Sequence, residues 1–306
     1  MPAKRLIMVG HAALDRVYRI EAFPPEPTKV RAIEAIEIGG GMAANAAVTA
    51  ARLGARVELW SRVGDDAPGT TIKAGLKAER VDTRYVQMFE DARSSTSAII
   101  VDDRGERLIV GMRDTSMPST TSLLPLERVA EADAVMADLR WLEAARAVLN
   151  EARRAGVPTI LDAELGAREA LPELLALADY AIFSSPALKD LVRGKDEQDA
   201  LDEVLAYGAN HAGVTLGSRG YLWRNKDGDS GLVPGFSVDA VDTTGAGDAF
   251  HGAFTLFLAQ QRPVQECARR AAAVAAIKCT RLGSRAGLPT LAGLEDFLAR
   301  HDTPKG

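Results

Sequence analysis

The segment DTTGAGDAFHGAF, residues 242–254, contains the residues whose types and spacing most clearly suggest chemistry. Gly245, Ala246 and Gly247 carry little or no side chain, so their N–H groups can approach an anion closely. A helical pattern follows, and a helix N-terminus offers unpaired N–H groups and the positive end of a dipole. Asp248 comes next and could accept a proton from an alcohol. The segment therefore predicts phosphoryl transfer, with a base beside an anion hole.

The same motif could also be purely structural. Acidic residues often occupy the first turn of a helix, and a short Gly-x-Gly-Asp motif alone occurs often without function. His251 lies three residues beyond Asp248 and shares its helix face. We expect His251 to pack or to support the site, and not to take part in the reaction.

The elements that must position this motif are short apolar runs that alternate with amphipathic patterns. Strands are predicted at 6–10, 57–64, 134–139, 158–163, 180–184 and 212–217. Helices are predicted at 42–53, 141–155, 196–207, 246–260, 263–279 and 291–301. This alternation is typical of βαβ units on a largely parallel sheet, so we predict a three-layer α/β sandwich.

Two further stretches, 16–38 and 94–112, alternate like strands without an intervening helix. They predict an antiparallel appendage to a single domain that spans residues 1–306. We expect it to form a small β lid, built from about 12–38 and 90–113, that closes over a substrate and excludes water from the reacting group.

Composition limits the possible partners. The net charge of -5 comes with mixed signs and without a Lys/Arg block, which argues against a nucleic-acid partner. No apolar run approaches the roughly 20 residues of a membrane span, so a cytoplasmic protein without a membrane partner is expected. Cys267 and Cys279 would lie about 18 Å apart on one helix. They are therefore expected to be free thiols.

Residues 242–254 match the signature of the ribokinase-like (PfkB) carbohydrate kinases, and the resemblance continues in GGGMAANAAVTAARLG (39–54) and VTLGSRG (214–220). It implies an ATP-dependent sugar kinase that uses Mg²⁺. Asp248 would be the catalytic base, and Gly245, Ala246 and Gly247 would form the anion hole.

The resemblance also implies binding residues. Those for the sugar would be Asp15, Gly40, Gly41 and Asn45. Those for the nucleotide would be Thr215, Gly217 and Gly220. Asp242 and Thr244, with the loop 281–287, resemble a site at which many relatives bind a monovalent cation such as K⁺. Taken singly, each of these residues could instead belong to a turn, a tight connection or a helix.

One departure from the family pattern concerns magnesium. Relatives usually carry Asn-x-x-Glu after a late strand, where the carboxylate helps to hold the metal through water. Here Ser184 and Ala187 stand at the matching positions. Mg²⁺ is still expected, because it neutralises the triphosphate, but the resemblance does not say which side chain contacts it.

Within the family, several segments are similar to sulfofructose kinases, among them SSTSAIIVDDRGERLIV, ADLRW and KCTRLGSRAGLP. This similarity implies phosphorylation of the C1 hydroxyl of 6-deoxy-6-sulfofructose. The anionic tail of such a sugar needs a basic receptor, and Arg140 follows a predicted strand. Lys29, Arg31 and Arg113 could reach the same tail. Gly111 and Met112 stand where such a kinase would carry a polar residue, so another ketose, ribose or a sugar acid stays open.

The sequence leaves two other functions to consider. A nucleotide-dependent oxidoreductase is disfavoured, because the turn after the first strand reads GHAALD and lacks Gly-x-Gly-x-x-Gly. A non-catalytic sugar sensor would keep the fold without the reaction, and Asp248 argues against it. Because lids in relatives often pair between subunits, the resemblance implies a homodimer formed through the lid.

Overall fold

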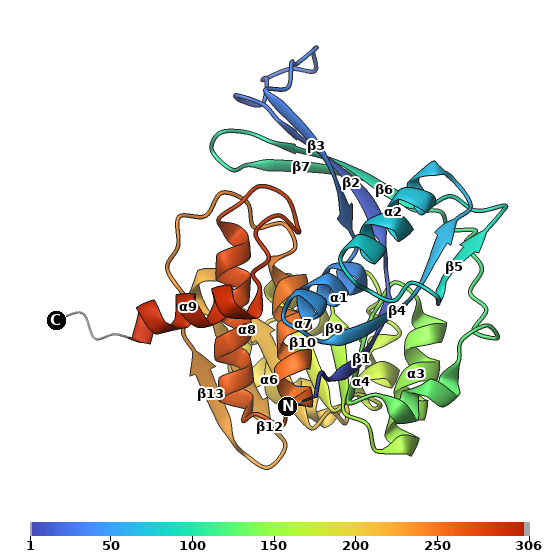
Figure 1. Ribbon diagram of the computed structural model, residues 1–306. Coiled ribbons are helices and arrows are strands. Elements are labelled where there is room, and N and C mark those ends of the chain that lie inside the picture. The colour runs from blue at the N-terminus through green and yellow to red at the C-terminus, as the bar shows by residue number, and fades with distance from the viewer. Residues whose placement is uncertain (1, 303–306) are drawn as a thin grey trace.

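A computed structural model describes residues 2–302 of the chain. It contains a large sheet with helices on both faces and a smaller sheet that projects from one end, as Figure 1 shows. The predicted three-layer α/β fold is confirmed. None of the helices within residues 2–302 combines the length and the apolar composition that a membrane crossing requires.

The large sheet has nine strands in the order β13-β12-β11-β10-β9-β8-β1-β4-β5. Their bounds are β1 Arg5–Gly10, β4 Arg56–Gly64, β5 Val86–Phe89, β8 Ala134–Asp138, β9 Thr159–Ala163, β10 Tyr180–Ser184, β11 His211–Thr215, β12 Tyr221–Asn225 and β13 Ser230–Val233. The seven strands from β11 to β5 run parallel, and β12 and β13 continue the sheet antiparallel. The carboxyl ends of the parallel strands therefore share one edge, where ligands bind in folds of this kind.

Helices cover both faces of this sheet. One face packs against α1 (Met42–Arg52), α2 (Ala67–Ala78), α7 (Ala246–Ala259), α8 (Val264–Cys279) and α9 (Leu291–Asp302). The other packs against α3 (Leu142–Ala155), α4 (Leu171–Leu175), α5 (Ser185–Leu191) and α6 (Glu197–Ala206). Alternate residues of β1 serve the two cores, since Met8 lies in the first and Val9 in the second.

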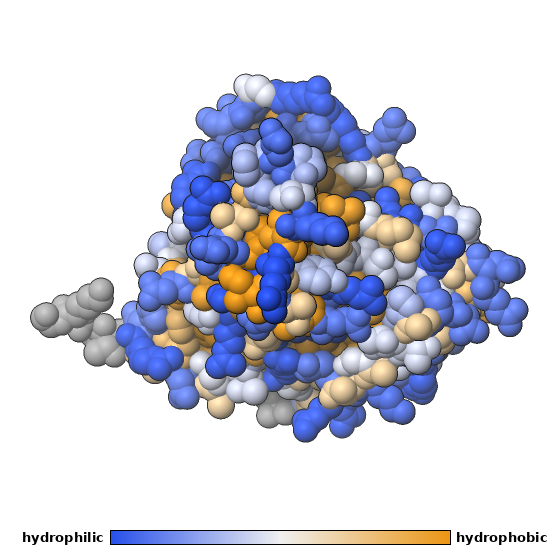
Figure 2. All heavy atoms as spheres, turned by 90° about the horizontal axis from the view of Figure 1, so that it is seen from above, coloured by the Kyte–Doolittle hydropathy of each residue, from blue (hydrophilic) through white to orange (hydrophobic). Residues whose placement is uncertain are grey.

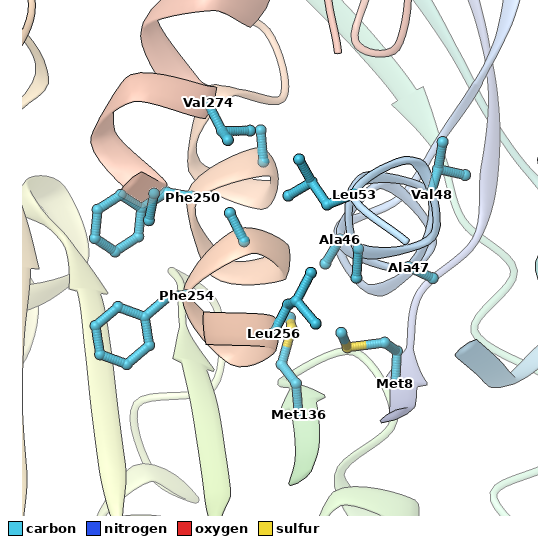
Figure 3. Packing of buried hydrophobic residues seen from close by; sticks show 14 of the residues in the cluster. Met8, Ala46, Ala47, Val48, Leu53, Met136, Phe250, Phe254, Leu256 and Val274 are labelled. Carbon is cyan, nitrogen blue, oxygen red and sulfur yellow. The ribbon is translucent and has the colours of Figure 1, made fainter. Parts of the chain in front are cut away.

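The pair formed by α1 and α7 carries much of the candidate site. Figure 3 shows Ala46 of α1 on the side that faces α7, with Leu256 of α7 between the two helices, whereas Phe250 and Phe254 extend from the opposite side of α7. The helices approach so closely that a Cβ on Gly252 would lie 2.3 Å from the Ala46 carbonyl oxygen. Small residues are therefore needed at this contact, and they bring the first turns of the two helices together.

The small sheet has the order β3-β2-β6-β7, with bounds β2 Ala13–Arg19, β3 Glu34–Gly40, β6 Ser95–Val101 and β7 Arg107–Met112. We call this sheet the lid. The lid was predicted to be antiparallel, but β2 pairs with β6 in parallel. The reason is that each strand leaves the same edge of the parallel main sheet, β2 after β1 and β6 after β5. The remaining lid pairs are antiparallel as predicted.

The sequence did not predict several elements, notably α2, β5, and the pair β12 and β13. Helix α2 follows an N-cap in which Asp66 accepts a hydrogen bond from the Gly69 N–H at 2.8 Å. Both cysteines lie buried in α8 as free thiols without a disulfide, as predicted. Seen from above, the face that carries the lid is hydrophilic around its rim and apolar toward its centre (Figure 2).

Candidate active site

Helix α7 presents its N-terminus toward the carboxyl edge of the main sheet. Gly245 is the N-cap residue, with a φ of 76° that a residue with a Cβ rarely adopts. A Cβ on Gly245 would also lie 2.9 Å from the Ser284 Cβ. Gly247 is exposed, and a Cβ built there would have no heavy atom within 4 Å. Open space in front of unpaired N–H groups suits an anion.

Asp248 lies in the first turn of α7, where its Oδ2 accepts a hydrogen bond from Asn45 Nδ2 at 2.7 Å. The pKa of Asp248 is raised to about 7, first by burial and then by the nearby Asp162, while the Asn45 hydrogen bond acts in the opposite direction. A carboxylate with a pKa near neutrality is well matched to general-base catalysis. The structure therefore places the predicted base and the predicted anion hole together.

Beneath Asp248 lies a buried polar layer. Asp162 is 4% exposed. Burial, with Asp138 and Glu164 nearby, raises its pKa well above the ordinary value. His251 lies deeper, with Nδ1 at 2.7 Å from the Gly247 carbonyl oxygen. Burial lowers the pKa of His251. His251 thus packs behind the first turn of α7, in agreement with the supporting role expected for it.

On the lid side of Asp248, Gly39 and Gly40 lie against two charged side chains. Asp15 Oδ1 accepts a hydrogen bond from Ser97 Oγ at 2.5 Å. A Cβ on Gly40 would lie 2.0 Å from Asp15 Oδ2, and a Cβ on Gly39 would lie 2.0 Å from Arg285 Nη1. Only glycine leaves room for these two charged side chains. Burial raises the pKa of Asp15, against the effects of Ser97 and Arg285.

Gly41 completes the turn that leads into α1. Its φ is 91°, and a Cβ there would lie 2.5 Å from the His11 carbonyl oxygen. Asn45 follows in the first turn of α1 and is 3% exposed. Asp15, Gly40, Gly41 and Asn45, which the resemblance assigned to the sugar, are therefore brought together beside Asp248.

Arg285 belongs to this group, although the sequence did not single it out. It is 5% exposed and donates from Nε to Asn45 Oδ1 at 2.8 Å and from Nη2 to the Gly40 carbonyl at 3.2 Å. Burial lowers its pKa to about 10. A lone arginine in a loop gives no sequence signal, and the resemblance drew attention only to backbone carbonyls there. In the structure, Arg285 holds the amide that in turn binds Asp248.

Three arginines gather around a buried histidine at the other side of this group. The pKa of His11 is lowered to about 4, first by burial and then by the charges of Arg140, Arg113 and Arg62. His11 Nε2 is buried without a hydrogen-bond partner among residues 2–302. Arg62 stacks on the Trp141 ring at 4.5 Å. We call His11, Arg62, Arg113 and Arg140 the basic cluster. Of these, only Arg140 and Arg113 were predicted.

The remaining predicted basic residues lie elsewhere. Lys29 and Arg31 are exposed in the loop between β2 and β3, which projects from the upper end of the lid in Figure 1. The structure gives them no contact with the basic cluster. Gly111 and Met112, where a polar residue was expected, are exposed at the end of β7.

The predicted nucleotide residues line a cavity of about 310 Å³ on the far side of α7. Thr215, Gly217 and Gly220 form one wall of this cavity, and Ala246 and Gly247 lie at its inner end. Gly220 has a φ of 103°, and a Cβ there would lie 1.9 Å from the Val233 carbonyl oxygen. The cavity therefore opens onto the anion hole.

The Glu164 carboxylate lies beside Ser184, which stands at a position where relatives carry the Asn-x-x-Glu motif. Ser184 Oγ donates to Glu164 Oε1 at 2.9 Å and also caps α5 by accepting from the Ala187 N–H at 3.3 Å. Glu164 follows β9, and the sequence analysis did not single it out. Within residues 2–302, no group of three or more His, Cys, Asp or Glu is placed to enclose a metal ion.

Asp242 and Thr244 lie in the loop that leads into α7. Asp242 Oδ1 accepts from the Thr244 N–H at 2.9 Å, and Oδ2 accepts from the Gly283 N–H at 2.8 Å. Asp242 therefore joins the two loops that were predicted to share a cation. Lys278 Nζ also donates to the Asp242 carbonyl oxygen, at 2.7 Å.

Comparison with known proteins decides the family. Residues 3–291 match the pfkB family carbohydrate kinase, which covers nearly the whole chain. The chain belongs to this family. The kinase is 30% identical to an ATP-dependent ribose-1-phosphate kinase of Halopiger xanaduensis, over 96% of this chain and 98% of that protein. It is 28% identical to the ribokinase of Bacillus subtilis, over 97% and 100% of the two chains.

Solved structures agree with this assignment. An Agrobacterium tumefaciens protein superposes with a TM-score of 0.94 at 37% identity, covering 98% of each chain. The ribokinase of Arabidopsis thaliana, solved with ribose and ATP, superposes with a TM-score of 0.85 at 26% identity, covering 97% of this chain and 99% of that one. The protein is therefore a carbohydrate kinase, and its reaction transfers a phosphoryl group to a sugar hydroxyl. These relatives do not point to sulfofructose in particular.

Proposed function

We propose that this kinase transfers the γ-phosphoryl group of ATP to a hydroxyl of a sugar that carries an anionic group, with 6-deoxy-6-sulfofructose as the first candidate. The observation that supports this proposal is the basic cluster, in which the charges of three arginines act on His11, whose Nε2 is buried and has no partner among the described residues. Buried polar atoms are normally hydrogen-bonded, so an unpartnered one marks a place for a ligand. An anion would bind there and offset the positive charge.

The proposal requires one small sugar to reach both the basic cluster and Asp248, and Asp138 supports this because it lies near both. Asp138 Oδ2 accepts hydrogen bonds from the His11 N–H at 2.7 Å and the Ala43 N–H at 3.1 Å. The same Asp138 raises the pKa of Asp248. The basic cluster and the base are thus both neighbours of one buried carboxylate. A sugar lying over Asp138 would place its anionic end at Arg140 and a hydroxyl at Asp248.

In the proposed reaction, Asp248 accepts the proton of the sugar hydroxyl as the oxygen attacks the γ-phosphorus. The new O–P bond forms while the bond to the β-phosphate oxygen breaks, and ADP leaves. The N–H groups of Ala246 and Gly247 bind the charge that develops on the transferred group. Asn45, held by Arg285, keeps the Asp248 carboxylate turned toward the hydroxyl.

ATP is proposed as the donor because the cavity along α7 opens onto the anion hole, and because a relative of the same fold was solved with ribose and ATP. Magnesium fits this arrangement through Glu164. Mg²⁺ usually binds one or two carboxylates together with substrate phosphates, so a complete protein cage is not needed. When bound, Mg²⁺ would neutralise phosphate charge.

A substrate panel tests this proposal. ADP release would be measured with sulfofructose, fructose, fructose 6-phosphate, ribose, ribose 1-phosphate and 2-keto-3-deoxygluconate. We expect the highest kcat/KM with an anionic sugar, and with sulfofructose among the anionic sugars. A clear preference for ribose or fructose over every anionic sugar would refute the role of the basic cluster.

We also propose that two copies of the kinase pair through the lid. Strand β7 is an edge of the lid, and all six of its residues are exposed, including Ile109 and Val110 at 56% and 59%. An unpaired apolar edge is a template for pairing, and a second copy offers a self-complementary partner. Light scattering should show a dimer that Val110→Lys dissociates and Leu232→Lys, on another exposed edge, does not. A monomer at high concentration would contradict this proposal.

A further inference from the structure

A buried lysine lies against Asp242, one of the residues at which the family resemblance implied a monovalent cation. Lys278 lies in the last turn of α8, and its side chain is 0% exposed. Its Nζ donates to the Asp242 carbonyl oxygen at 2.7 Å and lies 3.8 Å from Asp242 Oδ2. Lysine is almost never fully buried unless it is paired, so this contact is a specific feature of the chain.

The positive charges around Asp242 disfavour the binding of another cation. Its single negative charge faces the Lys278 ammonium and also the Arg107 guanidinium, whose Nη1 lies 3.7 Å from Asp242 Oδ1. Burial alone would raise the pKa of Asp242, but Lys278 and the N–H groups of Thr244 and Gly283 outweigh this effect and hold the pKa below its ordinary value. A potassium ion would meet two positive charges against one carboxylate.

The oxygens of Asp242 also accept hydrogen bonds. Asp242 Oδ1 and Oδ2 accept from the N–H groups of Thr244 and Gly283, and the Asp242 carbonyl accepts from Lys278. Alkali cations bind to oxygen lone pairs, so K⁺ would compete with these hydrogen-bond donors for the oxygens of Asp242. The residues at this site therefore do not fit K⁺, which differs from the expectation raised by the resemblance.

We propose that the Lys278 ammonium is a permanent internal cation of this kinase, and that the enzyme consequently needs no monovalent metal. Lys278 acts as a positioning residue. It holds Asp242, and Asp242 holds both Thr244, directly before Gly245, and Gly283 of the facing loop. The ammonium thus fixes the loop from which the anion hole begins. The proposal does not depend on which sugar is the substrate.

The first experiment uses the wild-type kinase in KCl, NaCl and tetramethylammonium chloride at equal ionic strength. Calorimetry would give the Kd of the magnesium complex of AMP-PNP, and thermal unfolding would give Tm. Because a bound ion stabilises the folded state by mass action, we expect Kd to change by no more than about twofold between the salts and Tm to stay the same. A specific gain of several-fold in affinity, or a rise in Tm, with K⁺ would overturn the proposal.

The second experiment compares two variants. Lys278→Ala leaves space beside Asp242, and Lys278→Met fills that space without a charge. In tetramethylammonium chloride we expect both variants to bind the AMP-PNP complex about tenfold more weakly, an ordinary size for coupled sites. K⁺ or NH₄⁺ should restore binding and raise Tm in Lys278→Ala only. If Lys278→Ala bound as tightly as wild type without K⁺, the proposal would be wrong. Should the variants fail to fold, the wild-type salt comparison still decides.

Discussion

The two ends of the candidate site differ in how completely their charged groups are paired. At the phosphate end, Asp242 has partners for both carboxylate oxygens and for its carbonyl. At the sugar end, His11 keeps a buried nitrogen without a partner among the described residues, and Arg140, Arg113 and Arg62 lie around it. We infer from this difference that the proposed phosphate end is ordered before any ligand arrives, whereas the proposed sugar end is completed by its ligand.

The largest expected effect is at Asp248, which lies between the two ends. Asp248→Asn removes the base but keeps the shape of the side chain. We expect kcat to fall by at least about 100-fold, since this is the low end for the loss of a general base. A coupled assay of ADP formation measures it, with Asp65→Asn at an exposed position as the control. Retention of near wild-type kcat would show that proton transfer does not depend on Asp248.

A change at the sugar end should depend on the charge of the substrate. Arg140→Leu removes one guanidinium from the basic cluster, and a hydrogen bond to a charged group contributes about 1.5–3 kcal/mol. We therefore expect kcat/KM for the best anionic sugar to fall roughly 10- to 100-fold.

Neutral sugars supply the contrast for this variant. Their kcat/KM should change little in Arg140→Leu, because neutral sugars have no anionic group that Arg140 could bind. Arg146→Leu, an exposed residue on α3 that pairs with Glu173, is the matched control. An equal loss for neutral and anionic sugars would indicate damage to the fold and not the loss of an anion contact.

The pH dependence of the reaction tests the environment of Asp248. Its pKa is raised to about 7, and only the deprotonated form can accept a proton. Therefore kcat/KM should decrease as pH falls below about 7, approaching tenfold per pH unit. The Asn45 hydrogen bond lowers this pKa, so Asn45→Ala should move the decline to higher pH. A flat profile between pH 5 and 8 would contradict the assignment.

The smallest expected effects concern the packing that supports both ends. Gly252→Ala would force a Cβ within 2.3 Å of the Ala46 carbonyl oxygen and separate α1 from α7. We expect the free energy of unfolding to fall by about 1–3 kcal/mol. Gly75→Ala, inside α2 with no atom near the new Cβ, should instead gain up to about 1 kcal/mol. Urea unfolding of the pair measures both changes, and a stable Gly252→Ala would mean that the helices can separate without cost.

Much of the fold could be predicted because local patterns and the final packing agree. The apolar run 134–139 became β8 (Ala134–Asp138), and the helical pattern 246–260 became α7 (Ala246–Ala259). The sequence missed β12 and β13, because short strands at a sheet edge carry weak periodicity. It also predicted the wrong direction for the β2–β6 pair, since the direction depends on where each strand leaves the main sheet.

The candidate site could be predicted where its residues are close together in the sequence. Asp248 and the residues before it fall in one segment, and so do Gly40 and Gly41. Arg285, Arg62 and Glu164 were missed because their roles depend on contacts with segments far away in the chain. Arg285, for example, reaches Asn45 across 240 positions. Nothing in the composition of a loop reveals such a contact.

One contact of the lid has a consequence for how the two substrates act on each other. Arg107, on β7, donates from Nη1 to Thr244 Oγ1 at 3.2 Å, directly before the start of α7. A strand of the sheet proposed to cover the sugar therefore touches the loop proposed to receive the phosphates. If sugar binding shifts β7, the affinity for nucleotide must change, and by reciprocity nucleotide binding must change the affinity for sugar by the same factor.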